Sequence, residues 1–579
     1  MNANTFFNNA AGIVRQPYHF NQFGGNLGGP AVKNKLFFFF YNYDAQRNTS
    51  PNAVFFPAIA LPTDAASQAG VRELGKYFVP YVTGLRNDIH TAKVDWAVNA
   101  NHTLSVRYNN HRFLGTNFEN PGAQSALERT GDSVINTDSV TVSHTWILGA
   151  NKVLDQRFLF YNEDNPSTVN GPGPEVVVRQ SGVIFMQFGR GNFLPRFVKQ
   201  KKVSGIQTLS WNKGRHSFKF VHDFRFERAH QFNTTLFYDQ YTFDSLADFA
   251  NRRPSAFAQT LTASGTPGGN VFPNGDDYAF FAQDAWQFDT RWSVTVGARY
   301  ERWRASEGAR TVDSAGVRRR TALPGREQDR VSPKLALAWR PVKDWTARLS
   351  LARTSRFPTV GELYQGITLA DGTVTNNNPT LRAESSFSKD LTFERALPQG
   401  VLRASLFEED TKDTLFTQTN TTTLVTNFQN IPKVLTRGAE MAFDQKGFLI
   451  DAVDLQAGLT YTDSEIRSNP AFPASEGKQF PRISHWRASL FATYHATAAL
   501  SLTAGWRYAS GQFSTLDNID TRATYGGVSG YSLVDLRAAY TLSRGFTVAL
   551  GVDNVTRYKY YQGHNLLQRT YFAEIKARF

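Results

Sequence analysis

The chain has 579 residues, a formal net charge of +14 and no cysteine, which excludes a disulfide scaffold and cysteine-ligated metal sites. Aromatic residues make up 14% of it, with 47 Phe and 22 Tyr, yet its mean hydropathy is negative. No stretch approaches the roughly 18 consecutive apolar residues that a membrane-spanning helix needs. These features favour one large closed sheet in which only alternate residues face lipid, rather than several globular domains.

Alternation of apolar and polar residues with a period of two runs from end to end, beginning with a predicted strand at His19–Ala31. In Trp345–Leu351 the odd positions are apolar, and Trp292–Tyr300 repeats the pattern. Trp486–Tyr494 follows it with one aromatic facing inward. Successive side chains of a strand point to opposite faces, so each segment has an apolar face and a polar face. The run Leu36–Tyr41 is the exception, because it is apolar on both faces.

Short and long connections alternate strictly along the chain, as in a transmembrane barrel with short periplasmic turns and long extracellular loops. The longest loops are expected at about 48–86, 164–200 and 230–276. The ten short turns are expected near Val32–Lys35, Asn99–His102, Gly149–Lys152, Asn212–Arg215, Asp289–Arg291, Pro341–Asp344, Leu397–Gly400, Gln445–Asp451, His495–Ala499 and Leu542–Gly545.

Ten hairpins and the final segment Arg569–Phe579 give 21 strands. Single-chain bacterial barrels have an even number of strands, so we expect one upward strand to be missing from a barrel of 22. Both His19–Ala31 and Arg569–Phe579 should then be edges of the sheet, with a gap or a short parallel contact between them. The predicted fold is therefore all-β, a large antiparallel transmembrane barrel.

Amphipathic rings gather near the strand ends, where they are expected to form girdles at the two membrane–water interfaces. Trp303 and Tyr508 are assigned to the girdle at the long-loop end. The girdle at the short turns comprises Trp146, Trp211, Trp286, Trp292, Trp339, Trp345 and Tyr540.

The basic residues are scattered, so the positive charge is interpreted mainly as a solvated, arginine-rich lumen and not as a nucleic-acid surface. These arginines either contact a ligand or a plug domain, or pair with lumen acids such as Asp535 and Glu574. By the alternation, the arginines that point into the lumen are Arg107, Arg299, Arg348, Arg487, Arg507 and Arg537.

The sequence predicts neither an enzyme nor a bound cofactor or metal. The 11 His residues are dispersed, and no nucleophile, base or metal-ligand set is clustered. The glycines Gly24, Gly25, Gly28 and Gly29 lack the spacing of a phosphate loop, and are interpreted as allowing close packing inside the barrel.

Several blocks resemble TonB-dependent receptors of the Oar-like type, in which a carboxypeptidase-regulatory-like domain and a plug precede the barrel. The most recognisable stretch is Ser332–Tyr364 followed by Asn378–Glu384 (NPTLRAE). The other matching blocks are Phe20–Pro30 (FNQFGGNLGGP), Lys35–Arg47, Tyr278–Trp303, Asn430–Glu440, Val552–Tyr558 (VDNVTRY) and Arg569–Phe579 (RTYFAEIKARF).

The resemblance implies an outer-membrane receptor, a monomer in contact with lipid and lipopolysaccharide, whose aromatic residues Tyr571 and Phe579 act in barrel assembly. It implies TonB as a partner only if a plug lies upstream. Met1–Ala11 is not a signal peptide, because it has no basic start and no apolar core. We interpret residues 1–18 as the loop after a missing first strand and 19–579 as the barrel, from a truncated gene model or a plugless product.

The predicted function is uptake of a scarce extracellular ligand, such as a siderophore, cobalamin, an oligosaccharide or a peptide. A passive channel, a surface adhesin and a non-functional gene fragment remain alternatives. Ligand contacts are expected from the loop after Leu351 and the nearby wall. The candidates are Arg353, Arg356, Tyr364, Asn376, Asn377, Asn378 and Arg507.

Overall fold

The fold is seen in a computed structural model of the whole chain. It describes residues 14, 19–57, 59–191, 194–233, 240–258, 269–306, 309–314, 317–322, 325–364, 367–368, 374–375, 378–419, 426–524, 526–543 and 545–577. The predicted residual loop 1–18 therefore lies outside the described residues, apart from Val14.

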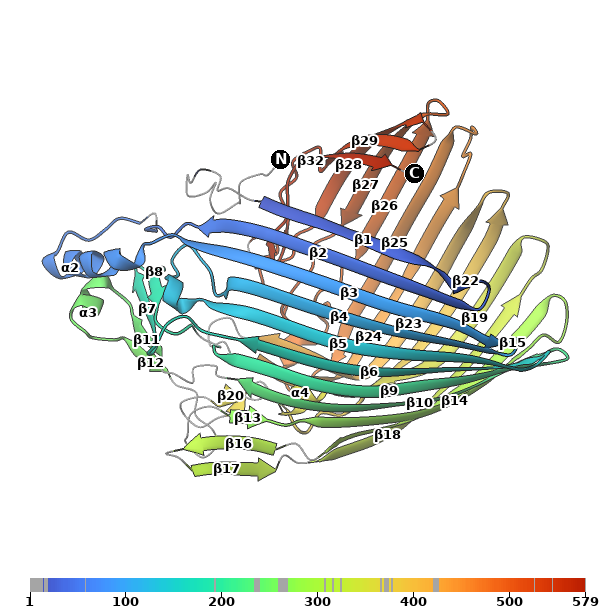
Figure 1. Cartoon of the computed structure of the whole chain (residues 1–579), viewed down its shortest axis with the longest axis horizontal. Coiled ribbons are helices and arrows are strands. Elements are labelled where there is room, and N and C mark those ends of the chain that lie inside the picture. The colour runs from blue at the N-terminus through green and yellow to red at the C-terminus, as the bar shows by residue number, and fades with distance from the viewer. Residues whose placement is uncertain are drawn as a thin grey trace.

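The described residues form one large curved sheet of 21 long strands, each antiparallel to the next along the chain (Figure 1). This confirms the predicted fold class and strand count. The short strands β13 (Gly269–Val271), β16 (Ala309–Ser314) and β17 (Val317–Ala322) extend the sheet beyond the long ones. The long strands are β1 (His19–Val32), β2 (Leu36–Asn52), β3 (Tyr81–Asn99), β4 (His102–Glu119), β5 (Gly131–Gly149), β6 (Lys152–Ser167), β9 (Arg196–Lys213), β10 (His216–Asn233), β14 (Asn274–Trp286), β15 (Trp292–Ser306), β18 (Arg326–Trp339), β19 (Trp345–Arg356), β22 (Glu384–Leu397), β23 (Gly400–Thr419), β24 (Thr426–Gln445), β25 (Val453–Ser468), β26 (Trp486–His495), β27 (Leu500–Ala509), β28 (Tyr531–Ser543), β29 (Phe546–Asp553) and β32 (Thr570–Ala577).

All ten short turns lie where the sequence predicts them, at one rim of the sheet, which we call the short-turn rim. The first turn joins β1 to β2 between Val32 and Leu36, and the last joins β28 to β29 between Ser543 and Phe546. The long connections emerge at the opposite rim, the long-loop rim. Strand direction therefore follows directly from the alternation of connection lengths.

In the described residues, the long strands contribute to buried apolar clusters only near the long-loop rim, as with Ile431 and Val434 of β24 and Ile466 of β25. Leu27, Leu550 and Ile575 are 67%, 61% and 75% exposed on the outer face. The predicted girdle at the short-turn rim is confirmed, because Trp146, Trp211, Trp286, Trp292, Trp339, Trp345 and Tyr540 all share this outer face by strand register. An apolar outer face that no protein covers is what a sheet surrounded by hydrocarbon requires.

Glycines on the lumen face make room for aromatic rings. A Cβ at Gly438 would lie 2.1 Å from the carbonyl oxygen of Tyr461 and 2.5 Å from the ring of Phe407. At Gly28, a Cβ would lie 3.1 Å from the ring of Phe39. The predicted packing role holds for Gly24 and Gly28, whereas Gly25 and Gly29 have nothing within 4 Å.

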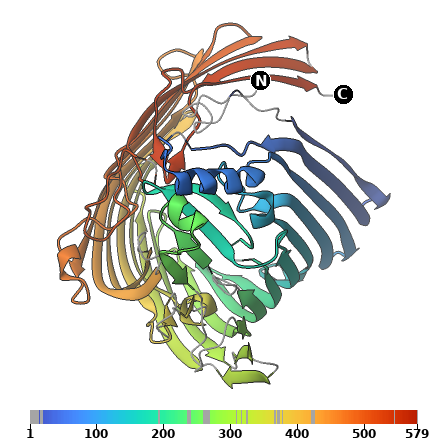
Figure 2. The same cartoon turned by 90° about the vertical axis from the view of Figure 1, so that its left-hand side faces the viewer.

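The sheet does not close on itself within the described residues. Strand β1 pairs with β2 alone and β32 with β29 alone, and Figure 2 shows the two edges apart. This confirms the expected gap. With 21 strands, each antiparallel to the next, β1 and β32 run in the same direction, so the regular antiparallel pairing used elsewhere cannot join them.

Several long loops carry secondary structure of their own, which the sequence pattern did not predict. The loop after β2 contains α2 (Ala65–Leu74) and η1 (Gly75–Tyr77), and the loop after β4 contains η2 (Leu127–Arg129). A four-stranded sheet joins two further loops, and the whole assembly, which we call the cap, lies across the opening at the long-loop rim (Figure 2). That sheet and its helix comprise β7 (Glu175–Gln180), β8 (Val183–Phe188), β11 (Gln240–Phe243), β12 (Ala256–Ala258) and α3 (Leu246–Ala250).

The remaining elements are short. Among the helices of the described residues, the longest is α2 with 10 residues, and none is long and apolar enough to cross a membrane. The other short elements are α4 (Val360–Tyr364), β20 (Ile367–Thr368), β21 (Val374–Thr375), η3 (Pro473–Ser475), β30 (Tyr561–Gln562) and β31 (His564–Asn565).

We expect Gly438→Val to destabilise the barrel by about 1–3 kcal/mol, because the new side chain would overlap the backbone of β25 and the ring of Phe407. The matched control is Ala439→Val, the next residue of β24, which points to the open outer face. The measurement is the urea midpoint of unfolding in detergent micelles. Equal midpoints for the two variants would contradict the packing role of Gly438.

Candidate functional site

Three of the six predicted lumen arginines are held by carboxylates. Arg507 Nη2 lies 2.7 Å from Asp535 Oδ2, and Arg537 Nη2 lies 3.0 Å from Glu574 Oε2. Arg299 bridges Asp223 (Nη1 to Oδ2, 2.7 Å) and Glu301 (Nε to Oε1, 2.8 Å). Asp535 and Glu574 are the partners that the sequence suggested. The Arg507–Asp535 pair joins the adjacent strands β27 and β28. The Arg537–Glu574 and Arg299–Asp223 pairs each reach across one intervening strand, β29 and β14 respectively.

The other three, Arg107, Arg348 and Arg487, form no ion pair in the described part of the chain. Arg487 stands opposite Ala509 and Thr460, at the end of β26 nearest the long loops. Arg507 of the neighbouring strand β27 is the cross-strand partner of Ser489, which follows Arg487 by two residues, so the two arginines are diagonal neighbours on the same face. An unpaired arginine beside a braced one gives this part of the wall a free positive charge.

Arg353 and Arg356 lie in β19, although the sequence analysis placed them in the loop after Leu351. By alternation, Arg353 shares the outer face with Trp345 and pairs in register with the exposed Phe387, so it points away from the lumen. Arg356 is on the lumen parity. Its Nη2 lies 2.6 Å from Glu362 Oε1, and Glu362 Oε2 accepts from Thr359 N at 2.7 Å.

Tyr364 is 3% exposed and belongs to an apolar cluster around α4 with Leu363, Leu381 and Trp303. Burial raises the pKa of its hydroxyl. Trp303 is only 4% exposed, so its assignment to the outer girdle is wrong. Trp303 and Arg299 are both odd-numbered residues of β15, so they lie on the same face, which is the lumen face. The alternation along β15 could therefore have assigned Trp303 to the lumen from the sequence.

Asn378 ties the loop to its neighbour, because its Nδ2 donates to the carbonyl oxygen of Phe428 at 3.0 Å. Its Oδ1 accepts from Thr380 N at 2.9 Å. Asn376 and Asn377 lie outside the described residues. Within the described residues, Tyr364 and Asn378 hold the loop together, and Arg356, at the end of β19, is exposed on the lumen parity.

The lumen face of β2 carries an aromatic patch, formed by Phe37, Phe39, Tyr41 and Tyr43. Phe37 and Phe39 are 39% and 37% exposed, and Tyr43 accepts a hydrogen bond from Gln22. This is the strand that the sequence predicted to be apolar on both faces. The patch is therefore an apolar surface turned toward the lumen.

The cap has its own hydrophobic core, which draws residues from four loops. Leu74, Phe185, Met186 and Leu246 are fully buried in it. The apolar runs of β7 (EVVVRQ) and β8 (VIFMQF) within a predicted loop were a signal for this core. Burial raises the pKa of Tyr77 to about 12, where the ring stacks on Phe188 with centroids 4.1 Å apart.

A buried ion pair joins three of these loops. Arg129 Nε lies 2.7 Å from Glu175 Oε1, and the two side chains are 14% and 3% exposed. Gln240 Nε2 donates to Glu175 Oε2 at 2.6 Å. The fourth loop is attached through an ion pair of 2.6 Å between Glu73 of α2 and Arg252, which follows α3. The cap is thus fastened as one body by both apolar and ionic contacts.

The loops of the C-terminal third form a second assembly. Asn518 Nδ2 donates to the carbonyl oxygen of Gln479 at 2.9 Å, and Gln479 N donates to Asn518 Oδ1 at 2.9 Å. Gly526 N donates to Gly563 O at 2.9 Å, which attaches the loop after β29. The described loops therefore present shaped surfaces around the opening.

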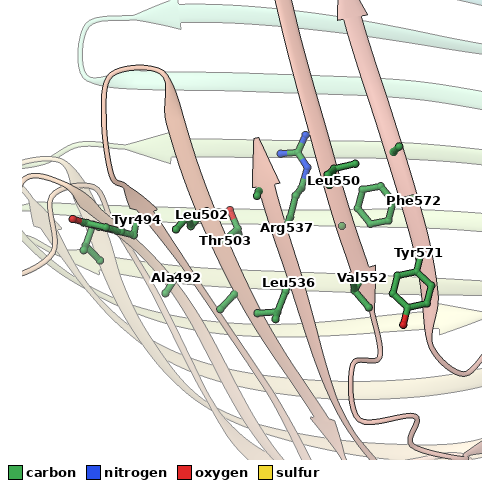
Figure 3. A pocket seen from close by; sticks show the side chains of 15 residues that line it. Ala492, Tyr494, Leu502, Thr503, Leu536, Arg537, Leu550, Val552, Tyr571 and Phe572 are labelled. Carbon is green, nitrogen blue, oxygen red and sulfur yellow. The ribbon is translucent and has the colours of Figure 1, made fainter. Parts of the chain in front are cut away.

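A broad apolar cavity of about 1180 Å³ lies on the wall formed by β25–β29 and β32 (Figure 3). Leu502, Leu536 and Tyr571 line it on the outer parity, with Arg537 and Phe572 on the lumen parity. The lining residues of the outer parity face the hydrocarbon that surrounds the sheet, so this cavity is not proposed as the site of a soluble ligand. Tyr571 is 57% exposed there, and Phe579 lies outside the described residues.

Among the described residues, no group of three or more His, Asp or Glu side chains could hold a metal ion. Asp520 instead caps the backbone of its own loop, accepting from Ser514 N at 2.9 Å. The site presents charged lumen side chains and folded loops.

Comparison with protein families gives two matches. The family described as TonB dependent receptor-like, beta-barrel matches residues 86–555. The family described as outer membrane beta barrel domain matches residues 1–84.

Two similar sequences carry names. "Probable TonB-dependent receptor BfrD" of Bordetella pertussis is 24% identical over 306 residues, 52% of this chain and 38% of that protein. "Probable TonB-dependent siderophore receptor PiuA" of Acinetobacter baumannii is 22% identical over 282 residues, 47% of this chain and 35% of that protein. The alignments thus span well under half the length of these relatives.

Solved structures share the fold. The ferric-catecholate import receptor Fiu of Escherichia coli superposes with a TM-score of 0.65 at 12% identity, over 98% of this chain and 83% of that one. The ferric enterobactin receptor PfeA of Pseudomonas aeruginosa gives 0.65 at 15%, over 97% and 78%. The copper transporter OprC gives 0.65 at 14%, over 97% and 80%.

We expect Glu175→Ala to lower the free energy of local unfolding of the cap by about 3–5 kcal/mol, because Arg129 would remain largely buried without its partner. The measurement is limited proteolysis of the cap loops by trypsin. Asp244→Ala is the control, since it removes an exposed pair with Arg179 at 4.0 Å, which is worth about 0–1 kcal/mol. A cap equally resistant in the Glu175 variant would show that this pair does not hold it.

Proposed function

Because this chain belongs to the family of TonB-dependent receptor-like β-barrels, we propose that it serves as a receptor for the uptake of a scarce extracellular ligand. It is a protein of the bacterial outer membrane. The family is one of receptors and transporters, not of enzymes, as the sequence predicted. The whole protein would draw on TonB as its energy-supplying partner.

The proposed ligand is an anionic iron chelate of the siderophore type. The observation that carries this proposal is the free positive charge of Arg487 beside the braced Arg507, near the opening under the folded loops. Arginine fits oxyanions through directed, charge-assisted hydrogen bonds. Relatives named for siderophores and for ferric catecholates support the same ligand class.

The geometry favours Arg487 over its neighbours as the first contact. Arg507 donates through both Nε (3.0 Å) and Nη2 (2.7 Å) to Asp535 Oδ2, so its charge is largely neutralised. Arg348 lies near the short-turn end of β19, and Arg107 lies six residues into β4 from the same rim. A ligand arriving from the long loops would meet Arg487 first and the deeper arginines afterwards.

The loop around α4 is proposed as the second contact region. Arg356 is the candidate there, because it is exposed on the lumen parity and its partner Glu362 could release it to an incoming anion. Tyr364 and Asn378 would act by holding the loop, given their burial and their bonds within it. Arg353 is a weaker candidate, since its side chain shares the outer face with Trp345.

We expect Arg487→Gln to weaken binding of ferric enterobactin, an anionic ferric catecholate, by about 10- to 100-fold, the worth of one charged hydrogen bond. Quenching of intrinsic fluorescence in detergent micelles measures the affinity. Lys389→Gln is the matched control, because Lys389 pairs with Glu408 on the outer face.

Unchanged affinity for the chelate in the Arg487 variant would show that this arginine does not contact the ligand. Failure of the unaltered chain to bind the chelate, together with a steady conductance across planar bilayers, would instead favour a passive channel.

A further inference from the structure

We propose that Lys152, Trp211 and Lys213 form a binding site for an anionic phospholipid on the outer face of the barrel, at the short-turn rim. Lys152 of β6 is the direct cross-strand partner of Trp211 in β9, and Lys213 follows Trp211 by two residues on the same face. The two ammonium nitrogens lie 4.8 and 5.5 Å from the centre of the Trp211 ring. This site is separate from the lumen and does not depend on the transported ligand.

Within the described ranges, neither Lys152 nor Lys213 forms an ion pair. Asp284, on the same face of the next hairpin, is hydrogen-bonded to His216 Nδ1 at 2.7 Å. The two ammonium groups beside the Trp211 ring repel each other. An anion bound between them would attract both and so offset this repulsion.

The position of the site identifies the anion. Trp211 belongs to the girdle of the short-turn rim, between Trp146 of β5 and Trp286 of β14. Such aromatic belts lie at the level of lipid headgroups, and short turns face the periplasm. The phosphate of a phospholipid in the periplasmic leaflet therefore lies at the height of the two lysines, where basic residues attract anionic lipid.

An apolar recess continues the site toward the membrane interior. A cavity of about 460 Å³ on the same strands is lined by Leu154, Leu209, Phe220, Phe280, Ala282 and Tyr300. Leu209 precedes Trp211 by two residues, about 7 Å along the strand. Leu154 follows Lys152 by the same interval. A charged end joined to an apolar recess fits an amphiphile with a phosphate head and an acyl chain better than a free phosphate ion.

The test uses the full chain in neutral detergent micelles, with phosphatidylglycerol and phosphatidylcholine supplied in equal amounts. Native mass spectrometry counts the lipid retained. We expect one phosphatidylglycerol per chain, and about 30-fold weaker retention in Lys152→Gln/Lys213→Gln, because each lysine near the surface contributes about 1 kcal/mol, or fivefold. Lys33→Gln/Lys35→Gln is the matched control, with the same charge change at the same rim.

A second variant tests the recess without touching the charge. Ala282→Trp should fill the cavity and weaken the retention of phosphatidylglycerol by at least fivefold. Its far-ultraviolet circular dichroism spectrum should match that of the unaltered chain, which shows that the sheet is intact. Equal retention of the two lipids, or equal losses of phosphatidylglycerol in the two lysine double variants, would overturn the proposal. The lipid would then be held by the scattered positive charge of the rim and not by a specific site. Displacement of the lipid by an equal concentration of inorganic phosphate would show that the ligand is a free anion, which also overturns the proposal.

Discussion

The requirement that every backbone polar group in lipid finds a partner governs this molecule. Twenty consecutive antiparallel pairings meet it for the interior strands, and each pairing also fixes which side chains face lipid and which face the lumen. The same register brings Arg507 to Asp535, Gly438 to Phe407 and Lys152 to Trp211. At β1 and β32 the requirement is unmet within the described residues, so this seam is where the sheet needs a partner strand.

The buried apolar clusters of the described residues lie at the long-loop rim, in the loops and at the adjoining ends of β15, β24 and β25. The wall exposes leucines and valines such as Leu27, Val296 and Leu550 on its outer face and holds arginine–carboxylate pairs such as Arg507–Asp535 on its lumen face, whereas buried clusters occur at the long-loop rim. The cap is built there as a small globular unit, with a hydrophobic core and a buried ion pair. Binding at the opening would therefore involve preformed surfaces, which lowers the entropy lost when a ligand is bound.

Local patterns were sufficient to predict the barrel. Turn positions depend on neighbouring residues, and alternation assigns faces. The ten turns, the strand count and the role of Asp535 and Glu574 as partners of lumen arginines could therefore be predicted from sequence. The cap could not, because its contacts join residues as far apart as Glu73 and Arg252. The burial of Tyr364 likewise depends on Leu381, near the end of the same loop, and on Trp303 of β15, which is distant in the sequence. The placement and burial of candidate site residues in the loops could therefore be established only from the structure.

The union of four loops in the cap has a consequence for how the cell surface is recognised. Glu175 touches Arg129 and Gln240, which come from two other loops, and Glu73 reaches Arg252 from a further one. An antibody or a phage that approaches the cell meets a discontinuous epitope assembled from all four segments. A synthetic peptide copied from any one of them would present its residues without that arrangement, and antisera raised against it would recognise the denatured chain better than the intact cell.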